Sequence, residues 1–330
     1  MIDVDPLIQD SFTRIYPVPT VTQDWEWVLR HAGAPRRRRQ RPSSFLVSMP
    51  RTVRLALIVM ALLLVMAGIA TATYLAVRAA PAKPGTIAFS RSGDIYIMRG
   101  DGSHLRRLTG FHEPRGTRRN HAFDFMPSWS PDGRTLTFTR LVPGADVFIY
   151  AINADGSGLQ RLRIGAFASW SPDGRAIAAF SGNGIWLMHA DGTLLRRLTK
   201  NFGYGPTWAP DGTRLAFSTN VGLFVINRDG SDLHRLVNDA GSPAWSPDGR
   251  RIAFIRGGKR ARLWLINSNG SGLRSLHVRV IEDSSVAWSP DGRRIAFTPR
   301  SRRGLYTLNA DGGEIRRLSH GLDGTPAWLP

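Results

Sequence analysis

The chain has 330 residues, of which 42% are hydrophobic, with a formal net charge of +19 and no cysteine. The absence of cysteine excludes disulfide bridges and thiolate metal sites, and a chain of this length can build a core without such bonds. A net charge so far from zero favours association with anionic partners.

Residues 1–54 are predicted to form a basic cytoplasmic tail that is largely disordered, because the segment is too short and too polar to fold alone. One stretch, Asp24–Arg30, contains two tryptophans and is a candidate amphipathic helix. It could dock a cytoplasmic partner or lie on anionic lipid, and lipid contact is the interpretation that we favour. No Cys/His zinc pattern is present, which argues against a zinc-binding anti-sigma domain.

Residues 55–77 form a run without any charged side chain, which predicts a single transmembrane helix because it is long enough to cross about 30 Å of hydrocarbon. A cleaved secretory signal peptide is the alternative. It is the weaker one, since the run starts late and is longer than the usual apolar region. More arginines precede the run than follow it. The predicted topology is therefore a single pass through the cytoplasmic membrane, with the N-terminus inside and the rest periplasmic or extracellular.

A repeat occupies residues 85–330, after a linker predicted at 78–84. Tryptophan recurs at intervals of 37 to 43 residues, at Trp129, Trp170, Trp208, Trp245, Trp288 and Trp328. The first five stand in the phrases SWSPDG, TWAPDG or AWSPDG. A second phrase, of the type NADGSGLQRL, also recurs six times. Proline, aspartate and glycine at these spacings predict tight hairpin turns, and the period indicates a solenoid or propeller.

Each repeat contains four short strand-like runs, of which Ile252–Phe254 and Leu263–Ile266 are examples. Four strands repeated six times predict an all-β fold, a six-bladed β-propeller of four-stranded blades. The first unit lacks a tryptophan strand and the last unit supplies only that strand. The strand at Trp328 is therefore expected to complete the blade that begins at Thr86, which would close the ring.

The two phrases, recurring in register, resemble the TolB-type propeller repeat, a relative of the WD repeat. The resemblance covers about residues 84 to 330. It implies a periplasmic or extracytoplasmic six-bladed propeller that acts by binding other molecules. The chain differs from the family's pattern in its predicted membrane anchor and in having no separate α/β domain ahead of the propeller.

The arginines outside the repeated phrases are predicted to form a basic rim. Strand order places the two tight turns of each blade on one face of the ring and the longer connections on the other face. The candidate ligand-binding residues on those connections are Arg115, Arg118, Arg119, Arg256, Lys259, Arg260, Arg262, Arg300, Arg302 and Arg303. They come from neighbouring blades and could attract an anionic ligand such as a phosphate-bearing envelope polymer. An arginine-rich composition without a binding role explains them equally well.

The repeated arginine pairs receive a different interpretation. Arg106/Arg107, Arg196/Arg197 and Arg316/Arg317 fall on the predicted outermost strand of a blade. We expect them to be solvated blade edges whose charge prevents edge-to-edge pairing.

The sequence offers little support for catalysis, since it contains no G-x-S-x-G motif and no hydrolase domain follows the repeats. His112, Glu113, His121 and Asp124 share one loop, but this spacing is weak support for a metal site. We therefore expect no catalytic residue, metal or cofactor, and no nucleic-acid partner outside the membrane. The expected function is a non-enzymatic binding scaffold for a protein or an anionic envelope polymer, anchored in the lipid bilayer through residues 55–77. The alternatives are a transmembrane sensor and an enzyme acting on envelope polysaccharide.

Overall fold

The computed structural model describes residues 85–110, 122–144, 146–182, 184–200, 203–281, 284–300 and 303–330. All of them belong to the second of two units, Ala79–Pro330. The predicted tail, membrane span and linker, residues 1–84, lie outside the described residues. None of the helices in the described part of the chain is long and apolar enough to cross a membrane.

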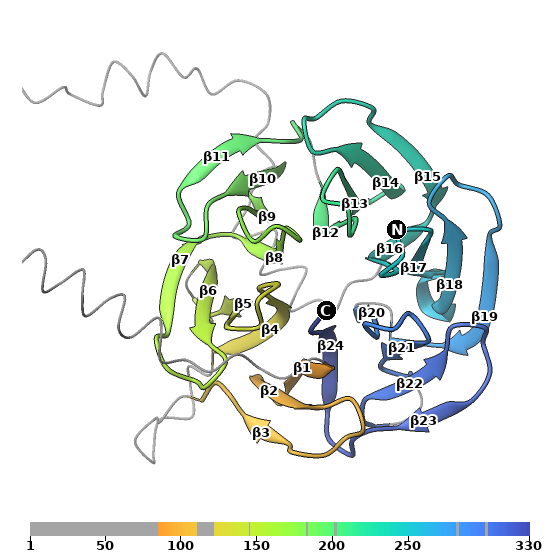
Figure 1. Cartoon of the computed structure of the whole chain (residues 1–330), viewed down its shortest axis with the longest axis horizontal. Coiled ribbons are helices and arrows are strands. Elements are labelled where there is room, and N and C mark those ends of the chain that lie inside the picture. The colour runs from red at the N-terminus through yellow and green to blue at the C-terminus, as the bar shows by residue number, and fades with distance from the viewer. Residues whose placement is uncertain are drawn as a thin grey trace, which may run out of the picture. The chain divides into compact units, whose positions relative to one another are not determined.

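The described residues form six antiparallel sheets of four strands, arranged as blades around a central axis (Figure 1). The first blade contains β24 (Asp323–Trp328), β1 (Thr86–Arg91), β2 (Asp94–Arg99) and β3 (Arg106–Arg107). The second contains β4 (Phe123–Trp129), β5 (Thr135–Leu141), β6 (Val147–Asn153) and β7 (Gln160–Ile164). The third contains β8 (Ala166–Trp170), β9 (Ile177–Ser181), β10 (Gly184–Met188) and β11 (Leu194–Arg197).

The remaining blades have the same strand order. The fourth contains β12 (Tyr204–Trp208), β13 (Arg214–Thr219), β14 (Gly222–Asn227) and β15 (His234–Asn238). The fifth contains β16 (Ala240–Trp245), β17 (Arg251–Arg256), β18 (Arg262–Asn267) and β19 (Arg274–Arg279), with the 3₁₀ turn η1 (Gly258–Arg260) between β17 and β18. The sixth contains β20 (Ala287–Trp288), β21 (Arg294–Phe297), β22 (Tyr306–Asn309) and β23 (Ile315–Arg317). The predicted six-bladed propeller is confirmed.

The ring closes through the two ends of the repeat region. Strand β24 pairs antiparallel with β1, with Trp328 opposite Ile87. The backbone N–H of Leu329 then donates to the carbonyl of Thr86 at 2.8 Å. The predicted closure is confirmed, and it pairs β1 on both sides, with β24 and with β2.

The repeated turn phrases form the tight hairpins that their residues predict. In the second blade, the N–H of Gly133 donates to the carbonyl of Ser130 at 2.9 Å. The Ser130 hydroxyl donates to Asp132 Oδ1 at 2.6 Å, and the N–H of Arg134 donates to the same carboxylate at 3.1 Å. Glycine is needed at the last turn position because its φ is +67°. The two backbone contacts recur in the third to sixth blades, although the fourth has Ala209 in place of the serine.

The core lies within and between the blades. The phenylalanines of the second strands, Phe89, Phe138, Phe254 and Phe297, are at most 1% exposed. Trp208 and Trp288 are also buried, and their indole Nε1 atoms donate to carbonyls of the preceding blade, at Ser169 and Ala244. These aromatic rings are core residues, as expected, and two of the indoles also tie neighbouring blades together.

The repeated arginines are exposed, as expected, except for the half-buried Arg197, and the structure adds a contact that the sequence did not indicate. The first arginine of each pair reaches a backbone carbonyl of the next blade. Arg106 donates to Asp155, Arg196 to Asp229 and Arg316 to Asp101. These arginines therefore link the blades at the periphery of the ring, including across the closure.

Candidate functional site

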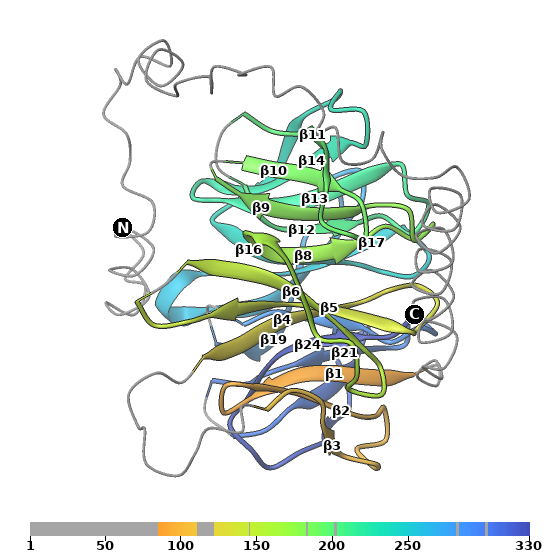
Figure 2. The same cartoon turned by 90° about the vertical axis from the view of Figure 1, so that its left-hand side faces the viewer.

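The two faces of the propeller differ in the segments that they carry. One face carries the turns between the first and second and between the third and fourth strands of each blade. The opposite face carries the connections between the second and third strands, together with the connections between blades. We call the second face the connection face. Figure 2 shows the ring edge-on, with the C-terminal end of the chain, which follows β24 on the turn face, at its right-hand side. The described residues of the predicted basic rim lie on the connection face.

The structure gathers much of the predicted rim at the fifth and sixth blades. Arg256 ends β17 and Arg262 begins β18, and the exposed Lys259 and Arg260 lie in η1 between them. Arg300 extends from the sixth blade, and its guanidinium donates to the carbonyl of Lys259.

Arg303 does not join this cluster on the described contacts. The carbonyl of Arg303 accepts a hydrogen bond from Arg317 Nη2 at 2.8 Å. Arg115, Arg118, Arg119 and Arg302 lie outside the described residues.

The sequence did not point to Arg279, which completes the cluster. Arg256 stands opposite Arg262 across β17 and β18, and Arg262 stands opposite Arg279 across β18 and β19. Directly opposed residues place their side chains on the same face of a sheet. We call Arg256, Arg262 and Arg279 the arginine row.

The arginine row has no acidic partner among the described residues. The register position beside Arg256 on the innermost strand is taken by Ala240. The guanidinium of Arg256 instead lies over the ring of Trp264, with 5.5 Å between Cζ and the ring centroid. Both Arg256 and Arg262 are half-buried, whereas Arg279 is exposed. The row thus presents three cations without a carboxylate between them.

The first two blades pair the corresponding arginine with an aspartate. Arg91 Nε donates to Asp323 Oδ1 at 2.5 Å, and Arg140 Nε donates to Asp124 Oδ1 at 2.5 Å. A second bond in each pair makes the contact bidentate. The hydrogen bond to Asp323 raises the pKa of Arg91 above its ordinary value. In these blades the guanidinium charge is matched inside the blade.

Register shows that these arginines occupy the same place as Arg256. Asp323 stands opposite Arg91, Asp124 opposite Arg140, and Ala240 opposite Arg256. On the other side of the strand, Asp94 stands opposite Arg91 and pairs with Arg107 at 2.8 Å, where the fifth blade has Arg262. In the fifth blade, Ala240 therefore occupies the position of Asp323, and Arg262 occupies the position of Asp94.

Asp124, named above with the candidate metal ligands, is a buried strand residue, 2% exposed, whose carboxylate is held by Arg140. His112, Glu113 and His121 lie outside the described residues. Within the part of the chain that the structure describes, no group of three or more metal-ligating side chains comes together.

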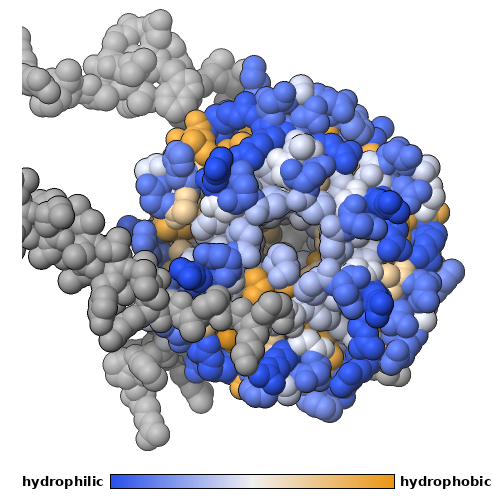
Figure 3. Space-filling model, viewed as in Figure 1, coloured by the Kyte–Doolittle hydropathy of each residue, from blue (hydrophilic) through white to orange (hydrophobic). Residues whose placement is uncertain are grey.

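An aromatic arc lies near the centre of the ring. The first strand of each blade is the innermost one (Figure 1), and the rings of Phe125, Phe167 and Tyr204 come from β4, β8 and β12. Neighbouring ring centroids are 6.5 and 6.4 Å apart. Figure 3 shows one face of the ring, with a central hollow and mainly hydrophilic residues around it.

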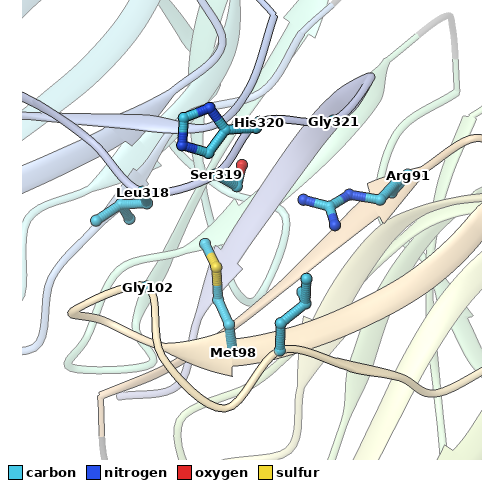
Figure 4. Close-up of a pocket in the computed structure, with 8 residues that line it drawn as sticks. Arg91, Met98, Gly102, Leu318, Ser319, His320 and Gly321 are labelled. Atoms are coloured by element: carbon cyan, nitrogen blue, oxygen red, sulfur yellow. The ribbon is translucent and has the colours of Figure 1, made fainter.

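A cavity of about 440 Å³ opens at the closure between the first and sixth blades (Figure 4). Arg91 and His320 lie on opposite sides of it, and Met98 and Leu318 supply apolar lining. The charge of Arg91 is already held by Asp323, which also accepts a hydrogen bond from Ser319. This cavity therefore offers a ligand less available charge than the arginine row does.

Comparisons with known proteins agree with the fold. No family model matches the chain. The Tol-Pal system protein TolB of Desulfosudis oleivorans is 32% identical over 127 residues, which is 36% of this chain and 29% of that protein's length. The structure is similar to TolB from Acinetobacter baumannii, with a TM-score of 0.63 and 20% identity over 78% of this chain and 70% of the other. The structure is also similar to a chain of a nidogen/laminin complex, with a TM-score of 0.60 and 12% identity over 74% of this chain and 99% of the other.

The expected resemblance is confirmed, since the chain is similar to TolB in sequence and forms a six-bladed propeller of four-stranded blades. The matched part of the curated relative is less than a third of that protein.

Proposed function

We propose that this protein is a membrane-anchored, extracytoplasmic β-propeller that binds a protein or an anionic envelope polymer on its connection face, without enzymatic activity. One observation carries the proposal: the arginine row and the neighbouring Lys259 and Arg260 concentrate positive charge on one sector of this face. Such a sector attracts and orients an anionic partner. The TolB relative is named for the Tol-Pal system, and the other structure is a nidogen/laminin complex, so similar propellers occur in assemblies of proteins.

The binding test compares two triple charge reversals. The first changes Arg256, Lys259 and Arg260 to glutamate, and the matched control changes Arg134, Arg175 and Arg250 on the turn face. Immobilised full chain is incubated with envelope extract separated into protein and polysaccharide fractions. We expect that at least one component of the extract binds to the unmodified chain and to the control but no longer binds to the first variant. Equal retention by both variants would reject the connection face as the binding surface.

We expect the connection face to point away from the bilayer, because a short linker at 78–84 would join the turn face to the predicted span at 55–77. The chain contains no native cysteine, so single labels at Arg260 and Asp248 report the orientation cleanly. We expect the label at Asp248 to be the closer one to lipid. Greater lipid proximity at Arg260 would contradict the orientation.

A transmembrane sensor is the second candidate function, based on the two tryptophans of Asp24–Arg30 in the predicted tail. Deletion of residues 1–35 separates the two candidates. An unchanged cellular response after the deletion rejects the sensor, whereas loss of the response with ligand binding intact favours it.

A further inference from the structure

The fifth blade differs from the first two at the place where each holds an arginine near the connection face. Arg91, Arg140 and Arg256 each follow the buried phenylalanine of the second strand by two residues. In the first two blades an aspartate of the innermost strand binds that arginine through two hydrogen bonds. In the fifth blade the aspartate position is Ala240, and the order of the four strands is the same.

The replacement leaves more than a single cation. Arg262 faces Arg256 where the first blade has Asp94, and Arg279 faces Arg262. Directly opposed like charges destabilise a sheet, so three of them in one row impose a cost on the fold. The described residues supply no carboxylate that offsets this cost, and an anion bound between the arginines would offset it.

The row also has the geometry that an oxyanion needs. A guanidinium binds an oxyanion through a planar fork of N–H donors, and the stacking of Arg256 on Trp264 holds one such fork in place. Arg256 and Arg262 are half-buried, so an anion between them would be partly shielded from water, which strengthens its attraction. Three cations suit a phosphate group better than a single carboxylate, because phosphate carries more charge and more acceptor oxygens.

We propose that Arg256, Arg262 and Arg279 form a phosphate-binding site, in which a phosphate group of the ligand lies between Arg256 and Arg262 and supplies the counter-charge that an aspartate supplies to Arg91 and Arg140 in the first two blades. The site rests on the proposed function, because it identifies the chemical group that the connection face recognises. The small side chain of Ala240 leaves the position beside Arg256 without a carboxylate of the protein's own.

The test restores the missing aspartate. In Ala240→Asp, the new carboxylate occupies the register position of Asp124 and Asp323 and competes with phosphate for Arg256. Binding is measured on the full chain in neutral detergent as the rise of Tm with inorganic phosphate, at constant ionic strength maintained with chloride. We expect a saturable rise for the unmodified chain and an apparent affinity at least about tenfold weaker in Ala240→Asp. We expect Arg262→Gln to weaken phosphate binding as well, which gives a second, independent test.

Arg250→Gln is the matched control, since it changes the net charge by the same amount on the turn face of the same blade. We expect it to bind phosphate as the unmodified chain does. No saturable phosphate effect on the unmodified chain, or an equal loss in Arg250→Gln, would overturn the site. If phosphate has no effect but the triple reversal at Arg256, Lys259 and Arg260 still loses its envelope ligand, only the phosphate site is wrong and the proposed function stands.

Competition then identifies the source of the phosphate. Displacement that strengthens with the chain length of polyphosphate indicates a phosphate-bearing polymer. Displacement by a water-soluble, short-chain phosphatidate, with no effect of polymer length, indicates a lipid headgroup. Either result supports the phosphate site, and failure of both to compete with inorganic phosphate contradicts it.

Discussion

Removing the aspartate of the second blade tests the reasoning on which the phosphate site depends. Asp124 and Arg140 are 2% and 4% exposed and make two charged hydrogen bonds, at 2.5 and 2.7 Å. In Asp124→Ala the guanidinium remains buried without its counter-charge. Breaking a buried pair in this way costs about 3–5 kcal/mol, whereas replacing both partners by apolar residues is often close to neutral. We therefore expect Asp124→Ala to be strongly destabilised and Asp124→Ala/Arg140→Met to recover most of the lost stability.

The assay is urea unfolding of the full chain at pH 7, followed by tryptophan fluorescence and combined into a double-mutant cycle. Asp94→Ala is the control, because its partner Arg107 is 48% exposed and such a pair contributes about 1 kcal/mol or less. A cost below about 1 kcal/mol for Asp124→Ala would refute the reasoning. An arginine at this position would then need no counter-charge, and Ala240 beside Arg256 would carry no information about a ligand.

Three further results are expected. Ala240→Asp should raise the free energy of unfolding in phosphate-free buffer by about 1 kcal/mol, since it pairs a half-buried arginine; an unchanged urea midpoint would contradict this. Deleting residues 323–330 removes β24 from β1 and should abolish cooperative thermal unfolding, and a sharp transition at the original Tm would argue against ring closure. Hydrogen bonds from Ser157 and Ser289 hold the pKa of Asp155 and Asp291 below the ordinary value. The stability that these two carboxylates contribute is therefore present above about pH 4 and is lost as the pH falls through the lowered pKa. Changing the serine of either turn to alanine should therefore make the free energy of unfolding less dependent on pH in the acid range.

The architecture could be predicted from the sequence because the features that determine it are local. Ser130, Pro131, Asp132 and Gly133 form a hairpin through contacts among themselves, and the same phrase recurs at a regular interval. The incomplete first and last units led directly to the pairing of β24 with β1.

The site was predicted less completely because it depends on register between strands. Arg256 and Arg262 were found because they flank one short connection. Arg279 lies at the far end of β19, and the pairing of β18 with β19 shifts between Arg262 and Trp264. Counting residues along the chain therefore cannot bring Arg279 opposite Arg262. Asp124 was assigned to a loop for a related reason, since β4 begins at Phe123 and turns this carboxylate towards Arg140.

The repeat allows the requirements of the scaffold to be separated from those of a ligand. Blades of one fold share the same backbone geometry, so a need of the scaffold should be met in the same way wherever the same residue recurs. The arginine after the buried phenylalanine recurs in three blades, and two of them satisfy it with an aspartate from the innermost strand. The fifth blade keeps the arginine, omits the aspartate and adds Arg262 and Arg279 beside it. Packing does not require this change, because Asp323 and Asp124 fit the same position when they are present. The proposed phosphate group would account for the difference, since the positive charge of the row favours an anion.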